Sequence, residues 1–365
     1  MRAFEHPIVA LPVSTFLKYE RHLSAISMVA GFGFDNYYLG RVDHPAAQLA
    51  LFGYVVMAVV SIVLVHFVES RHPEGLLLRA HPLLVVGTQF ALGGLWSAFL
   101  IFYGRSAVVS ASWPFLVILA GMLVGNEVFR KYQSRLAFTC TLLFFALFSY
   151  AIFIVPMVTR QMGPRTFLFS GSMAVVAFCA VLVVLSAIGP QRMAAAWRRI
   201  ALGSIGVYVT LNLFYFANIL PPLPLTLTTA GVFHSVTKTA DGFNAVAEPD
   251  SLLAAAGVAP TLHVAPGEPL YLYSAVFAPI QLRADIVHVW RYYDAKAGWQ
   301  TVSSVSFPIT GGREGGYRGF SVKSNPRAGN WRVDITTADG RLIGRVPFSV
   351  AAATGAVPKM VQVLK

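Results

Sequence analysis

Long runs of apolar residues, separated by short segments that carry arginine or lysine, dominate the first 236 residues of this chain. A helix needs about 20 mostly apolar residues to cross the hydrocarbon core of a membrane. Only 12% of the chain is charged and 56% is hydrophobic, far from the composition of a typical soluble protein. Seven runs meet or approach the required length, at 23–40, 46–68, 82–104, 107–129, 136–158, 166–188 and 200–220. We therefore expect an α-helical transmembrane bundle of about seven helices at 23–220, after a cytoplasmic N-terminal segment at 1–22.

The basic residues of the connecting segments predict the orientation of this bundle. Lysine and arginine accumulate in the cytoplasmic loops of membrane proteins. If all seven runs cross the membrane, one side holds eleven Lys and Arg residues and the other side holds four. The richer side includes the N-terminus, which is therefore predicted to be cytoplasmic, with the C-terminal domain in the periplasm of a Gram-negative cell. If the run at 23–40 only dips into the bilayer, the side of that domain is reversed.

The pattern changes after about residue 237 to short alternating runs between turn residues, which is typical of half-buried strands. Asp339-Gly340 supplies the turn that a tight hairpin requires. Seven strands are predicted, at 261–265, 269–277, 284–293, 299–307, 317–323, 330–337 and 341–350. This number and spacing favour an all-β immunoglobulin-like sandwich domain at 261–350, followed by a C-terminal tail at 351–365.

Three prolines, Pro221, Pro222 and Pro224, interrupt the apolar stretch that follows the seventh run. Proline removes a backbone donor and breaks a helix, which a membrane-spanning segment cannot tolerate without compensation. Residues 221–260 are therefore predicted to form a Pro-rich strap and linker between the bundle and the sandwich.

Asp35 is the candidate intramembrane site, because it interrupts the first apolar run. An ionisable residue inside a membrane segment is a functional-site hypothesis, with Arg41 as its candidate partner. The alternative is that Asp35 lies near the outer interface, among the tyrosines Tyr37 and Tyr38. Sequence alone leaves both interpretations open.

A second candidate site is a set of cations between residues 313 and 332 of the β domain. Arg313, Arg318, Lys323, Arg327 and Arg332 are interleaved with aromatic residues, of which Tyr317 is one. Such a set predicts a binding patch for an anionic glycan, a phosphate group or an acidic partner. The alternative is a set of solvated strand faces, because alternation sends Arg332 to water while its neighbour Trp331 turns inward.

No pattern in the sequence predicts catalysis, a metal or a cofactor. Cys140 and Cys179 both lie in apolar runs, so they build neither a zinc site nor a disulfide in the β domain. His288 has no recognisable nucleophile and acid beside it in the sequence. The net charge of +12 resides largely in short membrane loops, so nucleic-acid binding is not expected.

Several segments carry a family resemblance. They read GGREGGYRGFSVKSNP at 311–326 and GNWRVDITTADGRLIGRVPFSV at 329–350. The chain here resembles the C-terminal domain of a bacterial family catalogued as domain of unknown function number 2914. The segments KYERH at 18–22 and GFDNYYLGRVD at 33–43 resemble the membrane region that precedes this domain in such proteins. The resemblance implies a multi-pass bacterial membrane protein and brings no activity, ligand or catalytic residue.

Two functions follow as hypotheses. The first is a non-enzymatic inner-membrane protein whose periplasmic β-sandwich binds an envelope protein or an anionic glycan. The alternative is a transporter or lipid-handling protein that uses Asp35 and a fourth helix kinked at Pro114. In both cases the bilayer is the expected partner of the bundle.

Overall fold

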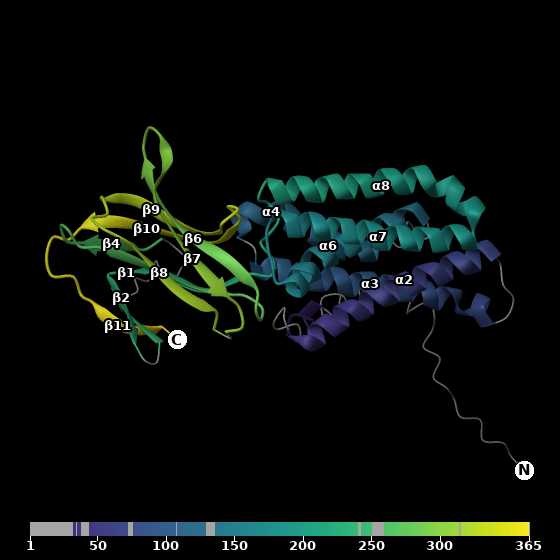
Figure 1. The fold of residues 1–365 in the computed structure, drawn as a ribbon, viewed down its shortest axis with the longest axis horizontal. Helices are drawn as coiled ribbons and strands as arrows, with labels where there is room; N and C mark the ends of the chain where they lie inside the picture. Colours follow the sequence, from purple (N-terminus) through teal and green to yellow (C-terminus); the bar gives the residue numbers. More distant parts are fainter. Residues whose placement is uncertain are drawn as a thin grey trace, which may run out of the picture.

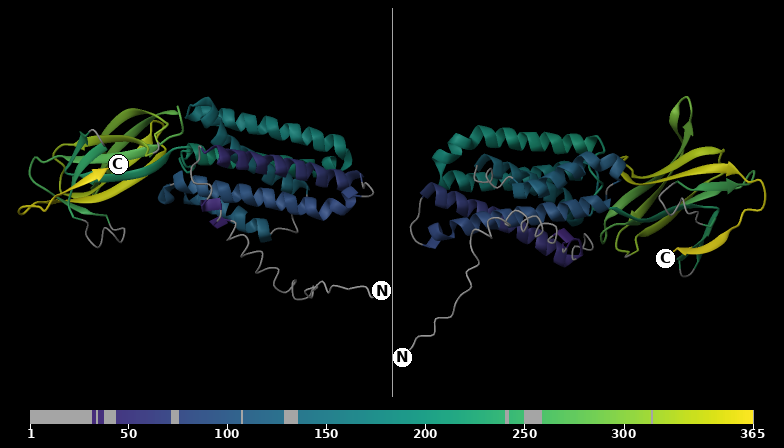
Figure 2. Two further views of the ribbon diagram at one scale, coloured as in Figure 1. Left: turned by 90° about the horizontal axis from the view of Figure 1, so that it is seen from below. Right: turned by 180° about the vertical axis from the view of Figure 1, so that it is seen from behind.

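A computed structural model describes residues 32–33, 35–37, 44–71, 76–106, 108–128, 136–239, 242–249, 259–313 and 315–364. A bundle of helices forms one half of the molecule and a β domain forms the other half, at one end of the bundle (Figures 1 and 2). Six long helices make up the bundle in these residues: α2 (Pro45–Arg71), α3 (Leu76–Ser106), α4 (Val109–Val128), α6 (Leu136–Thr159), α7 (Pro164–Ile188) and α8 (Pro190–Phe216).

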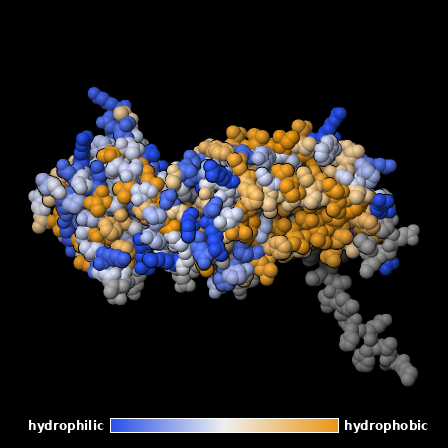
Figure 3. Space-filling model, in the orientation of Figure 1, coloured by the Kyte–Doolittle hydropathy of each residue, from blue (hydrophilic) through white to orange (hydrophobic). Residues whose placement is uncertain are grey.

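Each of these six helices is long and apolar enough to cross a membrane, which suggests a membrane protein. Aromatic side chains fill the interior, with Trp96 stacked on Phe145 and Phe102 stacked on Phe153 between α3 and α6. Apolar residues also cover the outside, among them Leu202, which is 72% exposed. Figure 3 shows this apolar surface over the bundle and a mostly polar surface over the β domain.

The last helix begins earlier in the sequence than predicted. The last helix spans 190–216 instead of 200–220, because Pro190 begins it at a position where proline costs no hydrogen bond. The arginines at 192, 198 and 199, which lie between the predicted runs 166–188 and 200–220, therefore belong to α8. The run at 23–40 lies outside the described residues except for 32–33 and 35–37, which are helical. Pro114 lies in the second turn of α4, and the kink there stays a prediction.

The β domain contains eleven strands in the described residues. All seven predicted strands are present, as β4 (Thr261–Val264), β5 (Leu270–Phe277), β6 (Arg283–Asp294), β7 (Gly298–Thr310), β8 (Tyr317–Lys323), β9 (Gly329–Thr337) and β10 (Leu342–Ala352). Four more were not predicted: β1 (Thr226–Phe233), β2 (Ser235–Thr239), β3 (Gly242–Ala247) and β11 (Met360–Leu364). The segment predicted as a strap and the predicted tail therefore both contain strands.

The strands form three sheets with the orders β1-β5-β8, β4-β10-β9-β6-β7 and β11-β3-β2. The first two sheets share one core, in which Leu272 of β5 packs with Trp290, Trp331, Ile335 and Phe348 of the five-stranded sheet. The predicted hairpin is confirmed, since Asp339-Gly340 connects β9 to β10 and Gly340 has a φ of 83°.

The tip of this hairpin rests on the bundle. The guanidinium of Arg341 lies 4.8 Å from the ring centre of Tyr215 at the end of α8, and its Nε donates to Asp339 at 2.9 Å. Two further contacts join the halves: Ser106 Oγ lies 3.2 Å from Thr226 Oγ1, and the Arg283 amide donates to the Arg160 carbonyl. The β domain is therefore fixed to the end of the bundle where α3, α6 and α8 terminate.

Candidate anion-binding site on the β domain

Three arginines converge on one buried carboxylate on the outer face of the five-stranded sheet. Arg345 Nε donates to Asp334 Oδ1 at 2.6 Å. Arg291 Nε and Arg332 Nε lie 3.2 Å and 3.5 Å from Asp334 Oδ2. The Asp334 side chain is 4% exposed, whereas those of Arg291, Arg332 and Arg345 are 34%, 16% and 30% exposed. We call these four residues the guanidinium cluster.

Strand alternation and register bring the cluster together. Arg332 and Asp334 are two residues apart in β9 and therefore share a face, while the residues between and beside them face the core. Arg345 of β10 pairs with Asp334, and Arg291 of β6 pairs with Arg332. Because β9 lies between β10 and β6, three strands place their cations within reach of one carboxylate.

The charges of this cluster do not balance. One carboxylate faces three guanidinium groups, which leaves two positive charges in excess at neutral pH. The Nε atoms of Arg291 and Arg332 are buried and lack a partner with hydrogen-bond geometry, so their contacts with Asp334 are electrostatic only. Burial lowers the pKa of Arg332, Asp334 opposes that effect, and Arg345 and Arg291 add to it. An anion bound at the exposed parts of these guanidinium groups would neutralise the excess charge.

Aromatic rings border the cluster on the β7 side. The guanidinium of Arg332 lies 4.4 Å from the ring centre of Trp299. Tyr293 packs against the same indole edge-to-face, with ring centres 5.3 Å apart, and both rings are partly exposed. An exposed aromatic edge beside arginines combines a flat apolar surface with charged donors, which suits a sugar ring that carries an acidic group.

The structure does not bring the sequence-predicted patch together on one surface. Arg313 lies 5.2 Å from the ring centre of Tyr317, just before β8. Arg318 and Lys323 belong to β8 and hence to the three-stranded sheet, where alternation places them on opposite faces. Arg327 lies in the loop before β9, and its carbonyl accepts from the Trp331 indole at 2.7 Å.

Of the predicted patch, only Arg332 belongs to the guanidinium cluster, and sequence analysis missed Arg291 and Arg345. Alternation alone indicates that Arg291 faces outward, since its neighbour Trp290 is in the core. What the sequence does not show is that β9 lies between β6 and β10, which places Arg345 and Arg291 on either side of Asp334.

Of the candidate intramembrane residues Asp35 and Arg41, the structure describes only Asp35. Asp35 accepts a hydrogen bond from Ser97 Oγ of α3 at 2.6 Å. Beside it, the Arg105 side chain donates to the Asn36 carbonyl at 3.0 Å. Arg41 lies outside the described residues. The contact of Asp35 with Ser97 therefore holds the short helical segment at 35–37 against α3.

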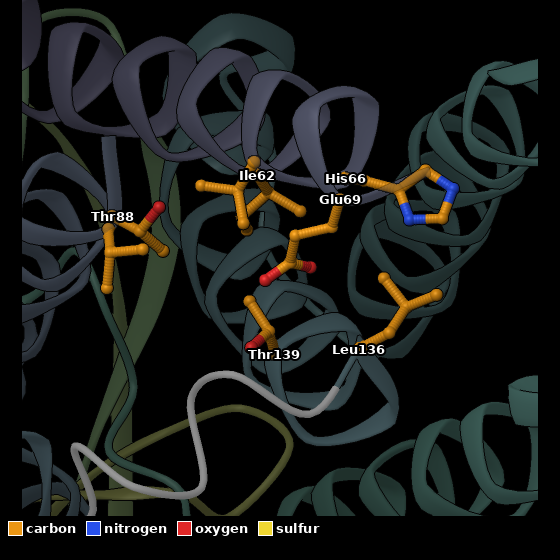
Figure 4. Close-up of a pocket in the computed structure, with 8 residues that line it drawn as sticks. Ile62, His66, Glu69, Thr88, Leu136 and Thr139 are labelled. Atoms are coloured by element: carbon orange, nitrogen blue, oxygen red, sulfur yellow. The ribbon is translucent and has the colours of Figure 1, made fainter. Parts of the chain in front are cut away.

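A small pocket lies at the opposite end of the bundle from the β domain, where α2 ends. Figure 4 shows the Glu69 carboxylate directed between Ile62 and Thr139, while the His66 ring turns towards another helix. His66 Nε2 lies 3.0 Å from the Leu185 carbonyl of α7. The cavity is small, about 30 Å³. The hydrogen bond of His66 holds α2 against α7.

Glu69 also makes an ion pair at this end of the bundle. Its Oε2 lies 2.7 Å from Arg192 Nη1 of α8, and its Oε1 lies 3.4 Å from His81 Nε2 of α3. Within the residues that the structure describes, no group of three or more His, Cys, Asp or Glu side chains could hold a metal ion.

His288 lies between two serine hydroxyls, a neighbourhood that the sequence did not reveal. Ser274 Oγ is 2.8 Å from Nε2 and Ser321 Oγ is 2.9 Å from Nδ1, and the Trp290 indole donates to Ser321 at 3.0 Å. Burial lowers the pKa of His288 to about 4, so the ring is neutral at neutral pH. All four residues are buried, so the network stabilises the core and is closed to a substrate.

Residues 283–350 match the family model described as "Protein of unknown function (DUF2914)". The β domain contains a DUF2914 domain. Every member of the guanidinium cluster, together with Trp299 and Tyr293, lies inside the matched segment. The DUF2914 domain thus covers β6 to β10, whereas β1 to β5 and β11 lie outside it.

No curated protein matches this sequence. Among solved structures, the chain is similar to "Pseudomonas fluorescens alkylpurine DNA glycosylase AlkC bound to DNA containing an abasic site analog". That likeness has 10% identity, covers 85% of this chain and 100% of the other, and has a TM-score of 0.24. A TM-score this low shows no common fold, so neither the fold nor the activity of that enzyme is attributed to this chain.

Proposed function

We propose that this chain is an inner-membrane protein that holds its DUF2914 domain in the periplasm, where the guanidinium cluster binds an anionic glycan. The excess of guanidinium groups over carboxylates on one sheet face is the observation that carries the proposal. In this proposal the domain recognises its ligand without catalysis, and the bundle anchors it.

The distribution of basic residues supports this orientation. The β domain contacts the end of the bundle near Ser106 and Arg160. The sequence segments that connect helices at that end carry few Lys and Arg residues, whereas the sequence at 71–79, 130–135 and 192–199, which follows or precedes helix ends at the opposite end of the bundle, carries eight. The basic end is cytoplasmic by the positive-inside rule, so the β domain is outside. A phosphatase fused after Lys365 would be active in the periplasm, and an inactive fusion would reverse the orientation.

An immunoglobulin-like sandwich is the proposed architecture of β4 to β10. Its support is the seven-strand count and the core shared by two sheets. In such a sandwich the outer face of the larger sheet is open to ligands, and the guanidinium cluster lies on that face.

A glycan is preferred over an acidic protein because of the rings beside the cations. Trp299 and Tyr293 offer exposed flat surface at the edge of the cluster, where a sugar ring can stack while its carboxylate reaches Arg291 or Arg345. The contact area of four residues suits a short oligosaccharide. Binding should weaken as salt increases, because the contacts are charged and partly exposed.

The test uses the full chain in nanodiscs of zwitterionic lipid, with an oligogalacturonate as the probe and a neutral maltooligosaccharide for comparison. We expect uronate binding that falls at least tenfold in the double variant Arg291→Gln/Arg345→Gln, which leaves Asp334 paired with Arg332. The matched control Arg318→Gln, on the other sheet, should bind as the unmodified protein does. Equal binding of the two sugars, or no loss in the double variant, would overturn the proposal. Binding of an oligoaspartate with no binding of the uronate would overturn the glycan class.

A further inference from the structure

An apolar cleft lies beside α8, which otherwise packs against α6 and α7. α8 lies at the periphery (Figures 1 and 2), and a cavity of about 280 Å³ lies between it, α6 and α7. Its walls include Phe144 of α6, Phe178 and Leu182 of α7, and Trp197 and Ala201 of α8. Only apolar atoms are exposed inside the cleft, and it opens to the outside of the bundle. An apolar space of this kind offers water no hydrogen-bond partners, and its walls lose dispersion contacts while it is empty.

The length of the cleft matches one leaflet of a bilayer. On α8 its lining runs from Trp197 to Tyr208, eleven residues apart. At 1.5 Å per residue this is about 16 Å, close to half of the roughly 30 Å hydrocarbon core. Trp197 is 52% exposed at the end nearer the α7–α8 turn, a setting typical of tryptophan at a membrane interface.

Unpaired cations lie at that same end of the cleft. Arg198 and Arg199 follow Trp197 and are exposed, and neither has an ion pair or hydrogen bond within the part of the chain that the structure describes. Arg192, by contrast, is paired with Glu69 at 2.7 Å. Arg198 precedes the lining residue Ala201 by three positions, so it borders the cleft on the helix surface. Side chains on a helix lean towards its N-terminus, which carries the Arg198 guanidinium towards the membrane surface.

We propose that this cleft binds one acyl chain of an anionic phospholipid, whose phosphate group pairs with Arg198. The apolar walls hold the chain along α7 and α8. Lipid tails elsewhere in the bilayer are equally apolar, so the walls alone give no preference among lipids. The preference for a negative headgroup comes from Arg198, at the level where phosphates lie.

Native mass spectrometry of the full chain in mild detergent tests this proposal, with phosphatidylglycerol and phosphatidylcholine of the same acyl chains as probes. We expect phosphatidylglycerol to remain bound at least fivefold more than phosphatidylcholine. Ala201→Trp, which fills the cleft, should abolish retention of phosphatidylglycerol. The matched control Leu202→Trp places the same side chain one residue away, where the surface is 72% exposed, and should retain the lipid.

Arg198→Gln separates the two parts of the site without filling the cleft. In this surface variant phosphatidylglycerol should be retained no better than phosphatidylcholine, with the circular dichroism of the unmodified protein. Equal retention of the two lipids by the unmodified protein would overturn the proposal. Retention that is unchanged in both Ala201→Trp and Arg198→Gln would overturn it as well.

Discussion

Replacing Asp334 with Asn should destabilise the β domain strongly while leaving its shape intact. The amide has nearly the same size as the carboxylate but carries no charge, so Arg291, Arg332 and Arg345 would face one another without a counter-ion. These three cations lie within 3.5 Å of the carboxylate oxygens in the unmodified protein. The substitution therefore converts a net attraction into repulsion at one buried position.

The size of the effect follows from burial. Removing one partner from a fully buried ion pair costs about 3–5 kcal/mol. The Asp334 side chain is 4% exposed, but the arginines are 16–34% exposed and can turn partly to water. We therefore expect the lower end, about 3 kcal/mol, which corresponds to a melting temperature lower by roughly 10 °C for a domain of this size.

Hydrogen exchange measures this locally in the full chain, because bundle and β domain need not unfold together. Peptides from β9 and β10 in Asp334→Asn should exchange about 100-fold faster, since each 1.4 kcal/mol is a factor of ten. Asp285→Asn is the matched control, since Asp285 is exposed on β6 of the same sheet and should change exchange less than threefold.

Added sulfate gives the reasoning a second test. An anion that binds beside the three guanidinium groups, and only in the folded state, would restore stability by about 2.7 kcal/mol at 100 times its Kd. Sulfate should therefore slow exchange more in Asp334→Asn than in Asp285→Asn. If β9 exchanges equally in the two variants, the three guanidinium groups do not depend on Asp334, and the electrostatic account of the cluster is wrong.

The remaining predictions concern the core and the joint between the halves. The pKa of His288 is about 4 in the folded protein and about 6.5 in the unfolded chain, so the unfolded chain takes up the proton first as pH falls. The free energy of unfolding should therefore fall by about 3 kcal/mol between pH 6.5 and pH 4. His288→Gln should remove this pH dependence in acid titrations followed by hydrogen exchange. Gly311→Ala would place a Cβ against the Pro279 carbonyl oxygen and should lower the free energy of unfolding by about 3 kcal/mol, measured by thermal melting. Gly355→Ala, which has open space around it, should change that free energy by less than about 0.5 kcal/mol in the same assay. Arg341→Gln removes a buried cation from the Tyr215 ring at the end of α8 and should destabilise the β9–β10 hairpin tip by about 2 kcal/mol. Hydrogen exchange should become faster at 337–341 and stay unchanged in β4. Uniformly faster exchange throughout the domain would contradict a local role of Arg341 at the contact between the β domain and the bundle.

Acidic residues outside the matched segment add to the acid sensitivity at lower pH. Burial opposes ionisation of Glu248, but hydrogen bonds from His263 and His234 outweigh it and lower the Glu248 pKa. Glu268 behaves alike: burial opposes ionisation, and hydrogen bonds from Lys359, Ala265 and His234 lower its pKa. Their stabilisation is present above about pH 4.5 and is lost as pH falls through the lowered values.

Local pattern was sufficient to predict most elements of the fold. Apolar runs of membrane length predicted seven helices, of which six are present in the described residues, and period-two alternation predicted β4 to β10. Both patterns depend only on neighbouring residues in the sequence, so they can be recognised without information about distant partners. The missed strands show the limit: β1 pairs with β5 and β11 pairs with β3, so their structure depends on residues far away in the sequence.

The sequence by itself determined two physically different halves, because apolar length and strand alternation are local properties of the chain. It also determined that Arg332 faces away from the core, since its neighbour Trp331 faces into it. Only the tertiary structure decided that Arg291 and Arg345 join Arg332 around Asp334 while Arg318 lies on another sheet. Strand order and register bring together residues that are more than 50 positions apart, and the charge imbalance they create exists only once the sheet has formed.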